Sequence, residues 1–141
     1  MTLFVPELTK GFVGLETGQS QLRWILIPVD HHPSTQWSIE AVCAMAMGLK
    51  EEKLSFHLFY VGKEGNLPHV RLPIRPEWQW DWTVASGMVA DEILSAAERL
   101  DCDLIVMSTQ GRRGFLDALY GNTTERVFCG SRIPLLTVPT S

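Results

Sequence analysis

The sequence predicts an α/β fold in which an open five-stranded parallel sheet is sandwiched by helices. Three observations lead to this prediction. Short apolar runs alternate with segments of helical periodicity along the 141 residues. The first run, WILIPV at residues 24–29, is almost continuously apolar, which is typical of a strand covered on both faces. Each strand, helix, strand connection is expected to cross over in the right-handed sense, so the strands run parallel.

Five segments are predicted as strands: residues 24–29, 54–61, 78–82, 103–107 and 134–138. The third is identified by the alternation of Trp78, Trp80 and Trp82 with polar residues, a period of two. Too few basic residues surround these tryptophans for a nucleic-acid stacking platform. They are therefore interpreted as a core or interface face of an edge strand.

Three segments are predicted as helices. The first follows Ser34 or Thr35 as cap and runs to about Leu49, and it is apolar around most of its circumference. Residues 88–100 carry one apolar face, and residues 122–128 form a short helix ended by glycine. Between the second and third strands, residues 62–76 contain two glycines and three prolines, so no regular element is expected to run far there.

Composition and charge exclude several classes of function. The formal net charge is −4 and the pI about 5.5, so no global field attracts nucleic acid or an anionic membrane. No run approaches the ~18 apolar residues of a membrane span. Cys43, Cys102 and Cys129 are odd in number and form no C-x-x-C pair, which indicates free buried thiols in a reducing cytoplasm.

The loop STQGRRGFLDALYGNT at residues 108–123 is the main candidate site. The chain contains neither the P-loop pattern nor GxGxxG. It offers Gly111, then nine residues, then Gly121 and Asn122 at a predicted helix start. Glycines and the free N–H groups of a helix N-terminus can hold phosphate. The alternative is that the loop only turns a corner, because Asn122 is a good N-cap and Glu125 stands three residues later.

Three stretches carry a resemblance to a known family. They are ILIPVD, AAERLDCDLIVMSTQGRRG and LYGNTTERVFCGSRIPLLTVP. Over about residues 23–139 the chain resembles a universal stress protein domain. The resemblance implies an adenine-nucleotide-hydrolase-like, Rossmann-type fold and a dimer. It also implies a role in stress response. The family contains members that bind ATP and members that do not.

ATP-binding members of this family share G-x2-G-x9-G followed by Ser or Thr. Here the nine-residue spacing is intact, but Ser108 replaces the first glycine and Asn122 the final Ser or Thr. The ligand implied is ATP, with or without Mg²⁺, or none, and binding weaker than in an intact member is expected. The implied nucleotide-binding residues are Pro28, Val29, Asp30, Met107, Ser108, Gly111, Arg112, Gly121, Asn122 and Thr123.

Individual residues of this set have two interpretations each. The resemblance places Asp30 against the nucleoside, whereas an Asx-type cap on the following turn is the alternative. It makes Val29 and Met107 walls for adenine, whereas both are equally expected as core residues. Arg112 or its neighbour could add a charge-assisted contact to phosphate. His31 and His32 lack further ligands for a metal and are interpreted as solvated loop residues.

The favoured function is a universal stress protein domain that binds ATP or a related adenine nucleotide as a regulatory ligand. The alternative is a nucleotide-free dimeric scaffold that has lost the phosphate site. A third hypothesis is a weak ATPase or phosphotransferase. No nucleophile with its base stands out, so nothing beyond slow nucleotide hydrolysis or autophosphorylation is expected.

The domain boundary is placed at residues 20–21. Residues 21–141 are assigned to the universal stress protein domain, and residues 1–20 to an N-terminal arm or linker, or the remnant of a preceding tandem domain. LFVP at residues 3–6 echoes LTVP at residues 136–139, so the arm is predicted to add to a strand edge. The last strand, residues 134–138, is expected to be an edge strand that pairs with a second copy.

Overall fold

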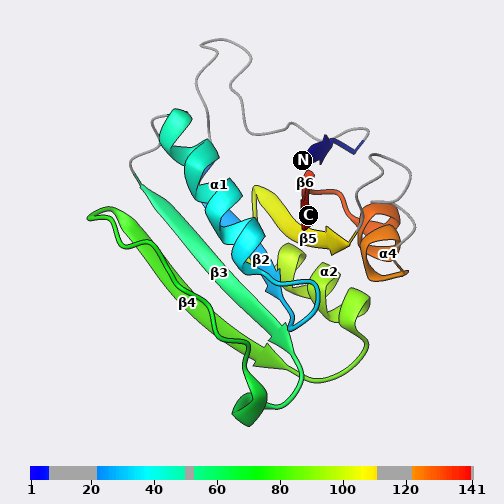
Figure 1. The fold of residues 1–141 in the computed structure, drawn as a ribbon. Coiled ribbons are helices and arrows are strands. Elements are labelled where there is room, and N and C mark those ends of the chain that lie inside the picture. Colours follow the sequence, from blue (N-terminus) through cyan, green and yellow to red (C-terminus); the bar gives the residue numbers. More distant parts are fainter. Residues whose placement is uncertain (7–21, 50–52, 111–121, 141) are drawn as a thin grey trace.

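The computed structural model describes residues 1–6, 22–49, 53–110 and 122–140. The first half contains β1 (Thr2–Phe4), β2 (Trp24–Val29), α1 (Gln36–Gly48), β3 (Leu54–Val61) and the single turn η1 (Glu64–Asn66). The second half contains β4 (Trp78–Ala85), α2 (Val89–Arg99), β5 (Leu104–Gln110), α4 (Asn122–Gly130) and β6 (Leu135–Thr140). Figure 1 shows these elements in one α/β layer arrangement.

The strands form one sheet in the order β1-β6-β5-β2-β3-β4. The strands β2 to β6 run parallel to one another, which confirms the five predicted strands and their direction. The sixth strand, β1, pairs antiparallel with β6. The sheet is therefore mixed, with a parallel block of five and one reversed strand at its edge.

The predicted edge at the last strand is wrong. The strand β1 lies outside β6, with Leu3 opposite Leu136, so β6 is the second strand from that edge. The related prediction that residues 3–6 add to a strand edge is confirmed for Leu3 and Phe4, and the pairing extends to Thr2. The physical reason is that an unpaired strand leaves a row of backbone N–H and C=O groups open, and the arm supplies their partners.

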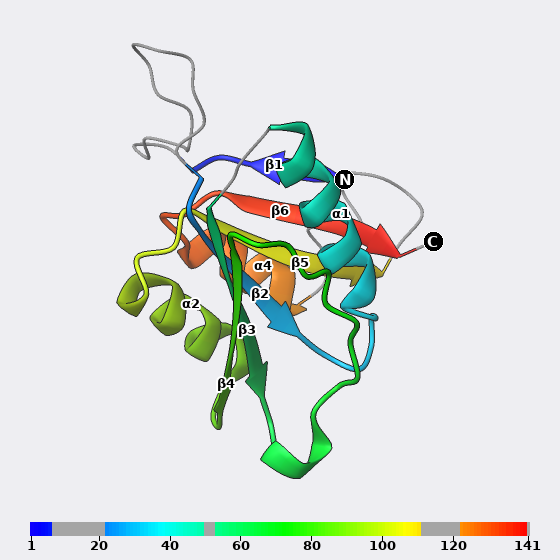
Figure 2. The same ribbon diagram turned by 90° about the vertical axis from the view of Figure 1, so that its left-hand side faces the viewer.

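Helices cover the two faces of the sheet unequally. Figure 2 shows α1 on one face and α2 with α4 on the other. The core under α1 contains Ile27, Phe56 and Leu58, and the core under α2 and α4 contains Leu26 and Phe59. Because alternate residues of a strand point to opposite faces, each apolar strand serves both cores. This double burial explains the continuous apolar runs in the sequence.

The tryptophans of β4 pack on the α1 face. The ring of Trp80 stacks on Phe56 with centroids 4.2 Å apart, and that of Trp78 meets Phe56 edge-on at 5.1 Å. The strand β4 ends the sheet. The interpretation as a core face of an edge strand is therefore confirmed. Trp82 is the exception, since 38% of its surface is exposed.

The glycine- and proline-rich connection acts as a strap beside α1. We call residues 67–77 the strap. The side chain of Gln36 both donates to Arg71 O (3.1 Å) and accepts from Arg71 N (2.9 Å). The indole of Trp80 donates to Pro73 O at 2.9 Å. Side chains of the strap pack on the core, so it covers a part of the sheet that a helix would otherwise cover.

Two cysteines lie in the core and one does not. Burial raises the pKa of Cys43 and of Cys102 to about 12, so both thiols stay protonated at neutral pH. Cys129 on α4 is exposed, unlike the prediction that placed all three thiols inside. Across the described parts of the chain, none of the helices has the length and apolar character needed to cross a bilayer.

Candidate site at the carboxyl ends of β2 and β5

The central strands β2 and β5 pair over only part of their length. Their register joins Ile25 to Leu104 and Leu26 to Ile105, whereas β2 pairs with β3 along all six residues. Beyond that point β2 and β5 diverge (Figure 2). The helix α1, which follows β2 in the chain, lies on one face of the sheet, and α4, the next described helix after β5, lies on the other. This is the switch point at which open α/β sheets bind ligands.

The end of β2 is shaped by two polar residues. The hydroxyl of Thr35 accepts from Asp30 N (2.9 Å) and donates to Asp30 O (3.2 Å). The Asp30 carboxylate accepts from His31 N through Oδ1 at 2.7 Å. This bond is to the next residue, whereas an Asx turn bonds the N–H two residues on, so the Asx-type cap stays a prediction. Asp30 is exposed, so its side chain is accessible from solvent.

The end of β5 is tied to α1 through two hydroxyls. The side chains of Ser38 and Ser108 share a hydrogen bond, and Ser38 is completely buried in α1. Ser108, which replaces a motif glycine, thus turns its hydroxyl toward the helix. Sequence reasoning missed Ser38. The available signal was one serine between the apolar residues Trp37 and Ile39, because a buried hydroxyl needs a hydrogen-bond partner.

The structure separates the two predicted adenine walls. Val29 packs in the core under α1, whereas Met107 packs in the core under α2 and α4. The two side chains therefore lie on opposite faces of the sheet, and both are core residues. Pro28, between Ile27 and Val29, is half-buried. Any contact of Met107 with a ligand at the strand ends would come from its backbone.

The remaining predicted residues lie around α4. This helix begins at Asn122, as predicted, and Thr123 is half-buried in its first turn. Gly111, Arg112 and Gly121, which belong to the predicted phosphate loop, lie outside the described residues.

His31 has a structural partner beside the carboxyl ends of β2 and β5, which we call the rim. Its Nε2 lies 2.7 Å from Asn66 O, and its ring meets Tyr60 edge-on with centroids 5.9 Å apart. His31 thereby joins the turn after β2 to η1. Within the described ranges, no group of three or more His, Cys, Asp or Glu side chains could hold a metal ion. Tyr60 and Asn66 are neighbours of the site that the sequence did not indicate.

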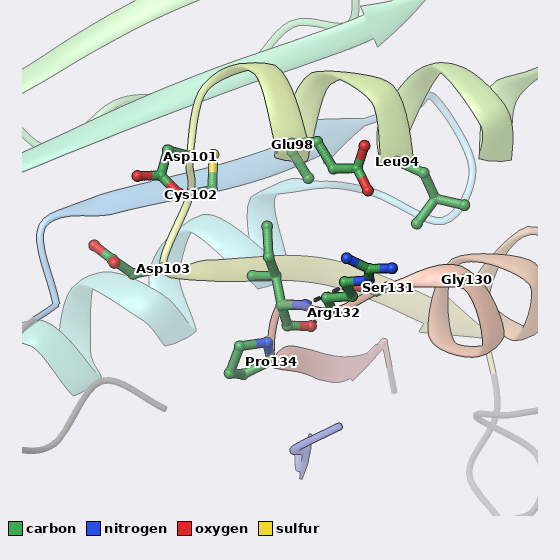
Figure 3. A pocket seen from close by; sticks show the side chains of 11 residues that line it. Leu94, Glu98, Asp101, Cys102, Asp103, Gly130, Ser131, Arg132 and Pro134 are labelled. Atoms are coloured by element: carbon green, nitrogen blue, oxygen red, sulfur yellow. Dashed lines mark hydrogen bonds between the residues drawn. The ribbon is translucent and has the colours of Figure 1, made fainter. Parts of the chain in front are cut away.

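A pocket of about 460 Å³ opens at the opposite end of β5 (Figure 3). It lies between the α2–β5 turn and the α4–β6 connection, and none of the predicted site residues that the structure describes lines it. Its lining residues are Leu94, Ala97, Glu98, Asp101, Cys102, Asp103, Gly130, Ser131, Arg132, Ile133 and Pro134. Asp103 has a structural role there, since its Oδ2 accepts from the backbone N of Arg23 and of Trp24, both at 2.9 Å.

Comparisons with known protein sequences point to one family. Residues 79–139 match the universal stress protein family. Universal stress protein MJ0531 of Methanocaldococcus jannaschii is 27% identical over 151 aligned positions, which cover 88% of this chain and 86% of that protein. Both findings support a universal stress protein domain in this chain.

Solved structures agree with this domain in fold. Hypothetical protein MJ0577 has a TM-score of 0.62 at 18% identity, covering 85% of this chain and 97% of that one. A universal stress protein from Archaeoglobus fulgidus has a TM-score of 0.61 at 18% identity, covering 86% and 45%. A universal stress protein family protein from Arabidopsis thaliana, solved with AMP bound, has a TM-score of 0.59 at 12% identity, covering 84% and 92%.

Proposed function

We propose that this universal stress protein domain binds ATP or a related adenine nucleotide as a regulatory ligand in stress response. The observation that carries the proposal is the divergence of β2 and β5 at their carboxyl ends, between the starts of α1 and α4. The Arabidopsis relative with AMP bound supports the choice of ligand. The proposed ligand is therefore an adenine nucleotide, and the proposed site is the carboxyl end of β2 and β5, where Asp30 and Ser108 lie.

Asp30 is assigned to the nucleoside. One carboxylate oxygen already accepts from His31 N, and a carboxylate has capacity for further donors. A ribose hydroxyl or the adenine amino group would supply such a donor. Pro28 and Val29 would then contribute from the end of β2 and Met107 from the middle of β5, through backbone atoms where the side chain belongs to the core.

The phosphates are assigned to the start of α4. The first N–H groups of a helix have no partner within it and carry a partial positive charge, so they attract phosphate. Asn122 and Thr123 form this first turn, and the motif adds Gly111, Arg112 and Gly121 by sequence. Mg²⁺ commonly binds through substrate phosphates with few protein ligands, so it would arrive with the phosphates of ATP.

Ser108 is expected to weaken the site. A glycine at that position would let a ligand approach the backbone closely, whereas Ser108 adds a side chain bonded to Ser38. One lost hydrogen bond to the ligand corresponds to about 1 kcal/mol, which is roughly fivefold in Kd. We therefore expect a dissociation constant several-fold above that of a relative with the intact motif.

The same contacts favour one alternative function. The hydroxyls of Ser38 and Ser108 satisfy each other, and Asp30 and Thr35 are paired within the turn. A rim whose polar groups already have partners needs no ligand to be stable. The alternative is a nucleotide-free scaffold that acts through protein contacts. Self-association through β6, which the family resemblance implies, is a proposal common to both functions, and it requires that β1 leave its place beside β6.

Calorimetric titration of the full chain with ATP, ADP and AMP at millimolar concentration tests the ligand. We expect Asp30→Asn to weaken binding by at least about fivefold, because it removes a charged acceptor. The matched control is Asp101→Asn, which removes an exposed carboxylate at the opposite end of β5. Asp101 has φ of 50°, a conformation that Asn tolerates well, so the turn should survive.

A second variant addresses the phosphates. Gly121→Val should abolish binding of ATP if the backbone at that position approaches phosphate closely. Absence of heat with all three nucleotides, in a chain shown to be folded by circular dichroism, would contradict the nucleotide proposal and favour the scaffold.

A further inference from the structure

The arm strand β1 is held by one buried anchor. Phe4 is 6% exposed and belongs to the core under α2 and α4. Its ring meets that of Phe128 on α4 edge-on, with centroids 4.9 Å apart. The hydroxyl of Thr137 donates to Thr2 O at 3.3 Å. The flanking residues contribute less, since Val5 is 57% exposed, so the docking of the arm depends on Phe4.

The arm repeats part of the strand on which it lies. Residues 3–6 read LFVP, and residues 136–139 in β6 read LTVP. Aligning the two places Leu3 on Leu136, Phe4 on Thr137 and Thr2 on Leu135. In the sheet, Leu3 lies opposite Leu136, Thr2 opposite Thr137 and Phe4 opposite Leu135. The arm thus resembles β6 and is paired antiparallel to it.

These two facts together define a symmetric pair of strands. If a second copy of β6 replaced the arm in this register, Leu136 would face Leu136 of the partner subunit. The flanking pairs would be Leu135 with the partner's Thr137, and Thr137 with the partner's Leu135. The two flanking pairs are equivalent under a two-fold rotation, as an isologous contact requires. The register of the arm is therefore one that two copies of β6 can adopt together.

We propose that the arm occupies the place of the partner's β6 and controls self-association. While β1 is docked, the β6 edge is closed and the chain is monomeric. When β1 leaves, two copies pair antiparallel through β6, and their sheets become continuous. This inference rests on the self-association proposed above, and it is independent of nucleotide binding.

The energetic balance is suited to a switch. The arm adds only three paired residues, and short terminal strands open at low free-energy cost. It competes well because it is part of the same chain and so has a high effective concentration. It also carries Phe4, whose contact with Phe128 is one that Thr137 of the partner subunit could not replace. At low protein concentration β1 therefore stays paired with β6 and excludes a second copy. Loss of the Phe4 contact should let the second copy bind in its place.

The direct test is the Phe4→Asp substitution in the full chain. A carboxylate cannot stay in the apolar site of Phe4, so the arm should leave. We expect sedimentation equilibrium to show a monomer for the unmodified chain and a dimer for Phe4→Asp at micromolar concentration, at least about tenfold tighter in Kd. The matched control is Val5→Asp, which adds the same charge one residue later at an exposed position and should leave the mass unchanged.

A peptide supplied in trans identifies the surface. A peptide of residues 1–6 should convert the Phe4→Asp dimer to monomers, and the same peptide carrying Phe4→Asp should not. If Phe4→Asp fails to fold, Phe4→Ala in the full chain serves the same comparison. A folded variant that stays monomeric would overturn the proposal. So would an unmodified chain that dimerises equally well, or a dimer that the arm peptide does not dissociate.

Discussion

The two ends of the β2–β5 contact differ in what holds them together. At the amino end the backbones pair through Leu26 and Ile105, and Asp103 N donates to Trp24 O at 2.8 Å. The carboxylate of Asp103 adds two further bonds to the start of β2. At the carboxyl end β5 is tied instead to α1, through the hydroxyls of Ser38 and Ser108.

This difference shows how one pair of strands serves both stability and binding. Backbone pairing with buried apolar side chains makes the amino end rigid. At the carboxyl end the helices that follow the two strands lie on opposite faces of the sheet, so the backbones separate. There the hydrogen bond between Ser108 and Ser38 connects β5 to α1 instead. Changes at the amino end should therefore cost stability and leave nucleotide affinity unchanged, whereas changes at the carboxyl end should affect both.

The largest effect is expected for Ile105→Ala at the paired end. Ile105 is completely buried, so the truncation removes apolar contacts and leaves a cavity. The cost should be about 2–4 kcal/mol of unfolding free energy. Urea denaturation followed by circular dichroism measures it. A loss below about 1 kcal/mol would mean that the paired end is not the stable part of the contact.

A smaller loss is expected for Asp103→Ala. The substitution removes the acceptor of two backbone N–H groups, for a cost of about 1–2 kcal/mol because the site is only half-buried. Asp103→Asn, which keeps one acceptor oxygen, is the matched control and should lose less. Equal losses for the two variants would show that the charge matters more than the hydrogen bonds.

The hydroxyl pair at the open end should contribute about 1 kcal/mol. Either Ser38→Ala or Ser108→Ala alone leaves one hydroxyl without its partner, so each single variant is destabilised. The double variant should cost less than the sum, with a coupling of about 0.5–1 kcal/mol in a double-mutant cycle. Strict additivity would argue against this hydrogen bond. The same variants titrated with ATP test whether this end also controls affinity.

The smallest effect is one of reactivity at the amino end. Burial raises the pKa of Cys102 to about 12, and the charges of Asp103 and Asp101 act in the same direction. Asp103→Ala should lower this pKa and speed the reaction of Cys102 with a thiol reagent at pH 9. Exposed Cys129 provides the internal reference, since its reaction rate should not change. An unchanged rate at Cys102 would show that this end stays closed without Asp103.

Much of the fold could be predicted from local patterns. Continuous apolar runs identified the parallel strands because burial on both faces removes the alternation of polar residues. Other features depend on how strands are placed across the sheet. The separation of Val29 from Met107 follows from which residue of β2 lies level with which residue of β5. The partnership of Ser38 with Ser108 joins positions that are 70 residues apart.

The sequence by itself determined the five parallel strands, the three helices, the resemblance to a family and the motif that suggests an adenine nucleotide. These depend on periodicity, local composition and spacing, which are properties of neighbouring residues. Only the tertiary structure decided that β1 closes the β6 edge, that β2 and β5 part at their carboxyl ends, and that Ser108 is bonded to α1. These depend on contacts between distant segments, whose free energies arise only when the whole sheet is assembled.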